Sequence, residues 1–283
     1  MNYRHAFHAG NFADVFKHTI LVGLIEALKA KQTAFCYFDT HAGSGRYDLR
    51  SEAARKSREY EDGVARLLGA TALPASAHIY LNLVRALNAE SNGSELAVYP
   101  GSPLIASSLM RDDDRAVLCE VQHSEAEKLK LLCASDARIG VHERDGYAAL
   151  GALLPPKERR GLVLIDPPYE AQGEEFRIVE SAIATAYARW PTGIYAIWYP
   201  IKLREPTMAL QRWFAREKIP NVLCVELLLH PDNSTLRLNG CGMIIVNPPW
   251  KFERQLAELL PVLRRYLSQG RFSQERIDWL TKS

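Results

Sequence analysis

The chain has 283 residues, of which 47% are hydrophobic and 24% charged, and its formal net charge at pH 7 is +2. This length and composition indicate a globular domain with a full core, and no apolar run approaches the roughly 20 residues that would cross a bilayer. The small net charge does not by itself indicate a nucleic-acid partner, so a basic surface is expected only locally. The five cysteines form no CxxC pair, which argues against a zinc site or other metal site and against disulfides, and we therefore expect a cytoplasmic protein.

The amino-terminal part of the chain predicts a helix, a strand and a loop that contains glycine. An apolar stripe predicts the helix over residues 11–30, with Asn11 as its N-cap. A strand is predicted from Ala34 to Phe38, and the loop Asp39-Thr40-His41-Ala42-Gly43-Ser44-Gly45 follows it. We read residues 1–10 as an N-terminal tail.

Gly43 and Gly45 let the loop backbone approach a ligand closely, although a plain tight turn is an equally good interpretation. A dehydrogenase fingerprint would need a third glycine at position 48, which is Asp. The acid before the glycines, Asp39, favours an amine-bearing or cationic ligand over a pyrophosphate. His41 lies inside the loop, where its side chain would face the ligand unless it has a structural role.

Residues 52–90 contain two apolar patterns at helical spacing that are separated by Pro74, and they predict a pair of helices. Ser102 and Pro103 predict the start of a further helix, with the serine as N-cap and the proline as first helical residue. The remaining predicted elements are strands over 116–121, 138–142, 161–165, 193–198, 222–229 and 243–246, a helix over 203–217, and a helix with a tail but no strand over 251–283. Strands that alternate with helices predict an α/β fold with a mainly parallel, doubly wound, seven-stranded sheet, which binds ligands beyond the carboxyl ends of its strands.

Acidic residues follow two of these strands. An acid in the position of Glu120 commonly binds the two ribose hydroxyls of a nucleoside, although a solvated loop acid is an equally good interpretation. Such an acid follows the glycine loop by roughly 20 residues, and only the removal of residues 49–96 brings the spacing here close to that value. We therefore predict one domain formed by residues 1–48 and 97–283, with 49–96 inserted as a helical subdomain over the ligand edge. Asp145-Gly146 is either a simple turn or an acceptor for an adenine amino group.

Asp166-Pro167-Pro168-Tyr169 comes directly after the apolar run at 161–165. The prolines fix φ and remove two backbone donors, so the free carbonyls and the carboxylate form a row of acceptors above the strand end. The tyrosine ring beside them offers a flat face. Acceptors next to a stacking face suit the exocyclic amino group of a purine or pyrimidine.

A second stretch of this kind, Asn247-Pro248-Pro249-Trp250, also follows an apolar strand. Only about 33 residues follow it, and none of them predicts a strand. We therefore expect this stretch at the end of the sheet, where its prolines would begin the last helix.

The combination of motifs resembles the S-adenosylmethionine-dependent N6-adenine methyltransferases and, more closely, the 23S rRNA adenine-N6 methyltransferase family of ribosomal RNA large subunit methyltransferase J. The resemblance covers the whole chain. It depends on the segments at 3–11, 39–47, 100–104, 161–170, 193–200 and 247–251.

The resemblance implies a Rossmann-like class I methyltransferase domain, S-adenosyl-L-methionine as methyl donor without a metal, and an adenine N6 of 23S rRNA as target. The implied cofactor contacts are His18, His41, Ser102, Glu120, Asp145, Gly146 and Asp166, beside the loop glycines Gly43 and Gly45. In the implied catalytic group, Asp166 and the Pro167 carbonyl accept the N6 protons and Tyr169 stacks on the base. Tyr3 would contact the RNA, and we add Arg4 and Lys202 as predicted contacts.

A base inside a helix could not reach these acceptors, so the target adenine is expected to be unpaired or flipped. We expect a monomer that acts on protein-free or early-assembly 23S rRNA, with no membrane involved. The alternatives are a DNA adenine methyltransferase, which would normally carry a larger recognition region, and a dehydrogenase or a binding module without chemistry. The missing third glycine argues against the dehydrogenase, and a binding module would give no reason for an acid beside two prolines.

Overall fold

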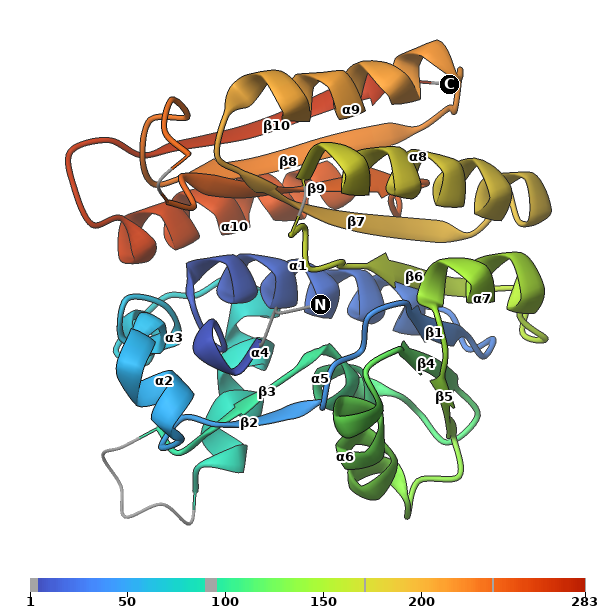
Figure 1. Ribbon diagram of the computed structural model, residues 1–283, viewed down its shortest axis with the longest axis horizontal. Coiled ribbons are helices and arrows are strands. Elements are labelled where there is room, and N and C mark those ends of the chain that lie inside the picture. The colour runs from blue at the N-terminus through green and yellow to red at the C-terminus, as the bar shows by residue number, and fades with distance from the viewer. Residues whose placement is uncertain (1–4, 90–95, 171, 236, 283) are drawn as a thin grey trace.

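The computed structural model describes residues 5–89, 96–170, 172–235 and 237–282, which fold into helices on both faces of one large sheet (Figure 1). This sheet has eight strands in the order β10-β8-β9-β7-β6-β1-β4-β5, and a second sheet pairs β2 with β3. The strands are β1 (Cys36–Asp39), β2 (Arg46–Asp48), β3 (Val98–Pro100), β4 (Arg115–Glu120), β5 (Ile139–Glu143), β6 (Gly161–Ile165), β7 (Ile194–Ile201), β8 (Val222–Leu228), β9 (Gly240–Val246) and β10 (Gln274–Thr281). The helices are α1 (Phe12–Lys29), α2 (Glu52–Ser57), α3 (Val64–Leu67), α4 (Ala75–Leu87), α5 (Ser102–Leu109), α6 (His123–Cys133), α7 (Gly146–Leu153), α8 (Gln172–Arg189), α9 (Arg204–Arg216) and α10 (Phe252–Leu267), with 3-10 turns η1 (His5–Phe7) and η2 (Glu59–Glu61).

The order of the strands reverses beside β1. From β1 the chain proceeds outward to β4 and β5, and then crosses back to β6 on the other side of β1. Asp39, the last residue of β1, is in parallel register with Leu118 and Leu164. Glu120 and Asp166 each lie two residues beyond these partners, so they flank the loop that follows Asp39. Such a reversal is where open α/β sheets bind ligands.

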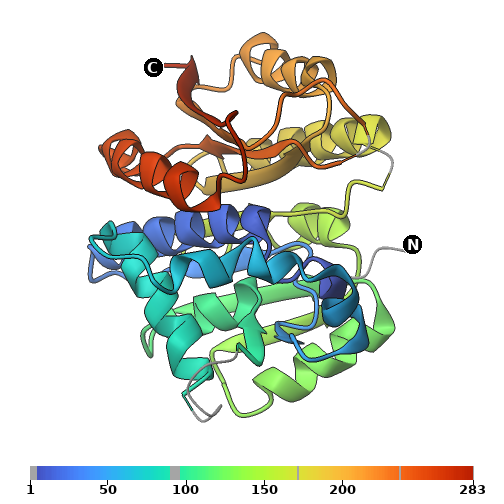
Figure 2. The ribbon, with the colours of Figure 1, turned by 90° about the vertical axis from the view of Figure 1, so that its left-hand side faces the viewer.

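Side chains of the central strands alternate between two apolar cores. On β1, Tyr37 packs into the core that includes α1, α5 and α10, whereas Phe38 packs into the core that includes α7, α8 and α9. Helices therefore cover both faces, which explains why all of β6 is buried and why its sequence reads as a continuous apolar run. Figure 2 shows α1 lying between α10 and the helices of residues 52–87.

The predicted α/β class is confirmed, but the seven-stranded sheet is wrong by one strand. Residues 251–283 contain the helix α10 and also β10, which pairs antiparallel with β8 at the edge of the sheet. The sequence of β10, Gln-Glu-Arg-Ile-Asp-Trp-Leu-Thr, carries several charged residues and no continuous apolar run. Charges of this kind are typical of an edge strand, which has a partner on one side only, and they conceal the strand from pattern analysis.

The expected place of Asn247 at the end of the sheet is also wrong. The strand before it, β9, lies between β7 and β8 and runs antiparallel to both, so Asn247 follows its strand at the sheet edge opposite Asp166. The Asn247 side chain donates hydrogen bonds to the carbonyls of Pro191 and Gly193, both at 2.8 Å. Strand direction therefore gives this stretch a structural role, while α10 begins after Lys251.

In the described part of residues 49–96, the first of the two expected helices is not continuous. It is divided into α2, η2 and α3, and α4 forms the second, with Pro74 before it as predicted. One division falls at Gly63, whose backbone (φ −109°, ψ −112°) is not helical and where a Cβ would lie 2.0 Å from the carbonyl oxygen of Gly10. β2 and β3 pair at the two ends of the segment, and Tyr80 of α4 packs in the same core as α1. Its status as an inserted subdomain stays a prediction.

Capping chemistry predicts the N-cap of α1 correctly but not that of α5. The Asn11 side chain accepts a hydrogen bond from the Asp14 amide, so it is the N-cap of α1 as expected. At α5 the N-cap is Gly101 instead of Ser102, because the serine hydroxyl bonds another side chain. Within the described ranges, no helix combines the length and the apolar character that a membrane span requires.

Candidate active site

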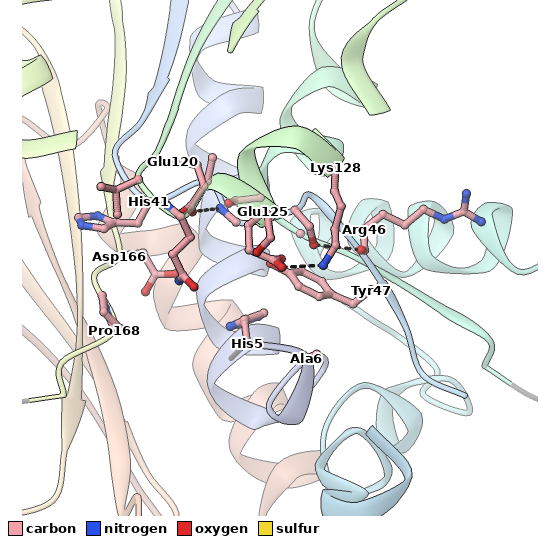
Figure 3. Close-up of a pocket in the computed structure, with 18 of the residues that line it drawn as sticks. His5, Ala6, His41, Arg46, Tyr47, Glu120, Glu125, Lys128, Asp166 and Pro168 are labelled. Atoms are coloured by element: carbon pink, nitrogen blue, oxygen red, sulfur yellow. Dashed lines mark hydrogen bonds and ion pairs between the residues drawn. The ribbon is translucent and has the colours of Figure 1, made fainter. Parts of the chain in front are cut away.

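A pocket of about 690 Å³ lies at the reversal point, beyond the carboxyl ends of β1, β4 and β6 (Figure 3). Of the predicted site residues, His18, His41, Gly43, Ser102, Glu120, Asp166 and Pro167 line it. Figure 3 shows His41 and Asp166 at one end of this pocket, and Arg46 and Lys128 at the other. We call it the first pocket.

The glycine loop and Glu120 are joined directly by hydrogen bonds. Gly43 and Gly45 have φ angles of 61° and 75°, in the left-handed region that favours glycine. The Gly43 amide donates to Glu120 Oε2 at 2.8 Å, and the Gln122 amide donates to Oε1 at 2.7 Å. Burial raises the pKa of Glu120, and these two amides oppose the shift. Each carboxylate oxygen keeps a lone pair that can accept a hydrogen bond from a ligand hydroxyl.

Asp39 has a different role from the predicted one. Its carboxylate is fully buried and accepts hydrogen bonds from the Tyr37 hydroxyl at 2.6 Å and the Ser102 hydroxyl at 2.7 Å. Burial raises its pKa to about 6. Asp39 therefore binds the start of α5 to the end of β1, and it is Ser102 that lines the pocket.

The two predicted histidines lie on the pocket wall. His18 Nδ1 is hydrogen-bonded to the Tyr99 hydroxyl at 2.8 Å, and burial lowers the pKa of His18 to about 3. His41 Nδ1 is hydrogen-bonded to the Thr40 hydroxyl at 2.8 Å, and burial lowers its pKa to about 4. Both rings are thus neutral at pH 7 and offer a ligand hydrogen bonds without charge.

Asp145 and Gly146 do not line the first pocket, and the contacts that they make are structural. Asp145 is the N-cap of α7, where its Oδ1 accepts from the amides of Tyr147 at 2.8 Å and Ala148 at 3.2 Å. A Cβ on Gly146 would lie 2.0 Å from the carbonyl oxygen of Thr40. Asp145 and Gly146 therefore fix α7 against the glycine loop. Of the two Asp145 carboxylate oxygens, Oδ2 takes no part in capping the helix.

Asp166 forms an ion pair that the sequence analysis missed. Lys17 Nζ lies 2.5 Å from Asp166 Oδ2 and 2.9 Å from Asp14 Oδ1. Burial opposes the charge on Lys17, but the two carboxylates outweigh it and hold the pKa of Lys17 well above its usual value. His5 Nε2 completes the cluster at 3.0 Å from Asp14 Oδ2. The available signal was the presence of Asp14, Lys17 and His18 in the first half of α1, where most of the other residues are apolar.

Tyr169 turns away from the first pocket. Its φ of 47° places it in the left-handed region, and its ring is only 5% exposed, between Trp198 and Phe176. The hydroxyl donates to the Trp198 carbonyl at 2.6 Å. The ring is therefore part of the wall behind the prolines, and its stacking on a base stays a prediction.

A second pocket, of about 970 Å³, lies on the other side of the same wall. The residues that line both pockets are His5, Lys17, Asp166, Pro167 and Pro168. Tyr169 and Lys202 line the second pocket alone, whereas Tyr3 and Arg4 lie outside the described residues. The acceptor row of Asp166 and the prolines thus separates two cavities.

Comparison with known proteins is consistent with this geometry. Residues 32–281 match the family model described as ribosomal RNA large subunit methyltransferase D, RlmJ. The chain belongs to the RlmJ family. Ribosomal RNA large subunit methyltransferase J from Haemophilus influenzae is 42% identical over 281 residues, and its Escherichia coli counterpart is 42% identical over 280, with 99% of each chain covered. The crystal structure of a Legionella pneumophila protein is 36% identical with a TM-score of 0.87, over 96% of this chain and 98% of the other.

The RlmJ family match includes the loops after β1, β4 and β6, which carry the glycines, Glu120 and Asp166. α1, which carries Lys17 and His18, precedes the matched residues. It lies within the nearly full-length alignments with the two RlmJ relatives. Both sides of the Lys17–Asp166 ion pair therefore lie in regions that are aligned with known members.

Proposed function

We propose that this RlmJ family member is an S-adenosyl-L-methionine-dependent methyltransferase that methylates N6 of an unpaired or flipped adenine in 23S rRNA. The observation that carries the proposal is the position of Asp166, Pro167 and Pro168 on the wall shared by two pockets. One pocket would hold the methyl donor and the other the target base, with the acceptors at the junction. The relatives that match over their whole length are named ribosomal RNA large subunit methyltransferases.

The acceptor and apolar groups of the first pocket fit a nucleoside-type cofactor. Glu120 would accept hydrogen bonds from the ribose hydroxyls, since each of its oxygens keeps a lone pair beside the Gly43 or Gln122 amide. Val121, which follows it, is 53% exposed despite being apolar, and it offers an apolar face to an adenine ring. Bound there, S-adenosyl-L-methionine would supply an electrophilic methyl group, so the protein needs to bind and orient.

The remaining predicted cofactor contacts divide into two groups. His18, His41 and Ser102 line the first pocket and offer hydrogen bonds to the amino-acid part of such a ligand. Asp145 Oδ2 would accept a hydrogen bond from the adenine amino group of the cofactor, because Asp145 begins α7 beside the glycine loop. Gly45 and Gly146 act through the backbone, because Gly45 has a φ of 75° that disfavours any side chain and a Cβ on Gly146 would lie 2.0 Å from the Thr40 carbonyl oxygen.

The adenine amino group would meet two acceptors, the Asp166 carboxylate and the Pro167 carbonyl. Lys17 holds Asp166 Oδ2, so Oδ1 is the oxygen left for N6. Two acceptors draw the N6 protons out of the ring plane and localise the nitrogen lone pair for in-line attack on the methyl group. The proton that leaves N6 would pass to Asp166 Oδ1, while Lys17 holds the carboxylate in place through Oδ2.

The second pocket would receive the base from the RNA. Its volume of about 970 Å³ suits a base that has left its helix, because a stacked base could not reach Asp166. Tyr169, Tyr3, Arg4 and Lys202 are the proposed RNA contacts. Protein-free or early-assembly RNA as substrate, a monomeric enzyme and a cytoplasmic location belong to the same proposal.

The test is methyl transfer from tritiated S-adenosyl-L-methionine to three substrates: protein-free 23S rRNA, assembled large subunits and DNA. We expect label in N6-methyladenosine of protein-free 23S rRNA, and none after Asp166→Ala with the fold retained by circular dichroism. Label in DNA alone would instead favour the DNA adenine methyltransferase. Normal turnover by Asp166→Ala would contradict the assigned role of the acceptor row.

A further inference from the structure

Basic side chains gather on one side of the second pocket. Lys202 follows β7, and His230 and Arg237 belong to the loop of residues 229–239 between β8 and β9. β9 is antiparallel to both β7 and β8, so β7 and β8 point the same way and their carboxyl ends lie at the edge that carries Asp166. Two separate loops thus bring these side chains to the cavity that Asp166 lines.

Asn239 joins the two loops from inside. Its side chain is fully buried, and its Nδ2 donates to the carbonyls of Lys202 at 2.6 Å and Ser234 at 2.7 Å. Its Oδ1 accepts from Arg237 Nε at 3.3 Å. One buried amide therefore fixes the backbone of Lys202 and the side chain of Arg237 relative to each other. Ordering two surface loops in this way costs conformational entropy, so a fixed position of these two cations favours a ligand-binding role.

A second support holds the same loop at Asp232. The Arg204 guanidinium lies 2.6 Å from Asp232 and 2.7 Å from Glu226, which is fully buried on β8. Glu226 also pairs with Arg276 Nη1 at 3.4 Å, so both carboxylates already have a cationic partner in the fold. Among the described residues no carboxylate lies within ion-pair distance of Lys202 or Arg237, so both cations are available to a ligand.

The opposite side of the pocket differs in charge. It is formed by residues 57–62, whose acids Glu59 and Asp62 bind His8 and Arg66 respectively. His230 is neutral at pH 7, since burial and the nearby charge of Arg237 lower its pKa, and it can form uncharged hydrogen bonds. A polyanion that enters the pocket would therefore be attracted along the side of Lys202 and Arg237.

We propose that Lys202 and Arg237 bind the RNA phosphates that flank the target adenine, with His230 of the 229–239 loop as a hydrogen-bonding partner. The inference depends on the proposed function and specifies where the RNA backbone runs. An acidic protein partner is less suited to this surface, because the cations open onto the cavity of Asp166 and not onto a separate face. The two loops would set the direction in which the strand crosses the pocket.

The test compares the double variant Lys202→Ala/Arg237→Ala with the control Lys157→Ala/Arg254→Ala, which removes the same charges. Lys157 precedes β6 and Arg254 follows β9, so both lie at the opposite edge, and both are exposed. The measurement is filter binding of in vitro transcribed 23S rRNA without cofactor, at several KCl concentrations. We expect roughly tenfold weaker binding and a log–log salt slope reduced by about 1.4, about 0.7 for each lost contact with single-stranded RNA, in the first variant only.

Methyl transfer separates this inference from the proposed function. At saturating RNA, the first variant should keep its kcat within about twofold while its KM for RNA rises in parallel with the binding constant. Binding and salt slope equal to wild type, or an equal loss in the control, would overturn the inference while wild-type methylation still supports the function. No transfer to any RNA by the wild type would contradict the proposed function itself.

Discussion

Lys17→Met tests the ion pair that the structure places beside the acceptor row. Methionine keeps the apolar stem of Lys17 and removes only the ammonium group, which contacts Asp166 Oδ2 at 2.5 Å and Asp14 Oδ1 at 2.9 Å. Lys17 is 6% exposed and Asp14 3%, so this part of the cluster is buried, whereas Asp166 at 16% opens onto the pockets. Removing one partner of a buried pair costs about 3–5 kcal/mol.

The lower end of that range applies here, for two reasons. Asp14 keeps hydrogen bonds from His5 at 3.0 Å and the Gly10 amide at 2.9 Å, and water in the pockets can solvate Asp166. We therefore expect the free energy of unfolding to fall by about 3 kcal/mol. Because the carboxylate loses its fixed orientation, kcat should fall by about a hundredfold.

Urea denaturation and single-turnover methyl transfer measure the two effects. The matched control is Lys29→Met on the same helix, where Lys29 pairs with Glu26 at 2.6 Å but the two side chains are 27% and 35% exposed. A pair this exposed is worth about 0.2–1 kcal/mol. If Lys17→Met is no less stable than Lys29→Met and its kcat lies within about twofold of wild type, the assigned role of the ion pair is refuted.

Three further changes test separate parts of the site. Glu120→Gln should weaken S-adenosyl-L-methionine binding by tenfold or more in calorimetry, at about 1.5–3 kcal/mol for each charge-assisted hydrogen bond; unchanged affinity would remove its ribose role. Gly146→Ala should lower the melting temperature, since its Cβ would lie 2.0 Å from the Thr40 carbonyl oxygen, and an unaltered melting curve would contradict that packing. Burial lowers the pKa of His18 in the fold to about 3, so its stabilisation of the folded state is complete above the unfolded pKa of about 6.5 and is lost progressively as pH falls from there toward 3. Between pH 6.5 and 5 wild type should lose up to about 2 kcal/mol more than His18→Asn, and parallel pH profiles would refute this.

The sequence was sufficient for the features that depend on neighbouring residues. Gly43, Gly45 and the two prolines after Asp166 constrain their own backbone, so a loop and an acceptor row at strand ends could be predicted locally. Glu120 was found in the same way, because strands predict the sheet edge at which their carboxyl ends meet. Its contact with the Gly43 amide could not be predicted, since the two lie 77 residues apart.

The features that the sequence missed depend on contacts between distant elements. Lys17 and Asp166 are separated by 149 residues, and nothing in either local pattern indicates that they pair. β10 was missed because an edge strand tolerates charges, and strand direction, which gives Asn247 its structural role, is decided by pairing. Asp39 was assigned to the ligand on its position alone, although Tyr37 and Ser102 occupy its carboxylate in the fold.

The most direct test of the central claim is nucleoside mass spectrometry of 23S rRNA after incubation with S-adenosyl-L-methionine and the enzyme. Wild type and Asp166→Asn should be compared at equal cofactor occupancy, measured by calorimetry. Asparagine keeps the shape of Asp166 but loses the charge that pairs with Lys17 and one of the acceptors for N6. We expect one N6-methyladenosine per 23S rRNA with wild type and at least a hundredfold slower formation with Asp166→Asn. Equal rates, or a methyl group on another atom, would contradict it.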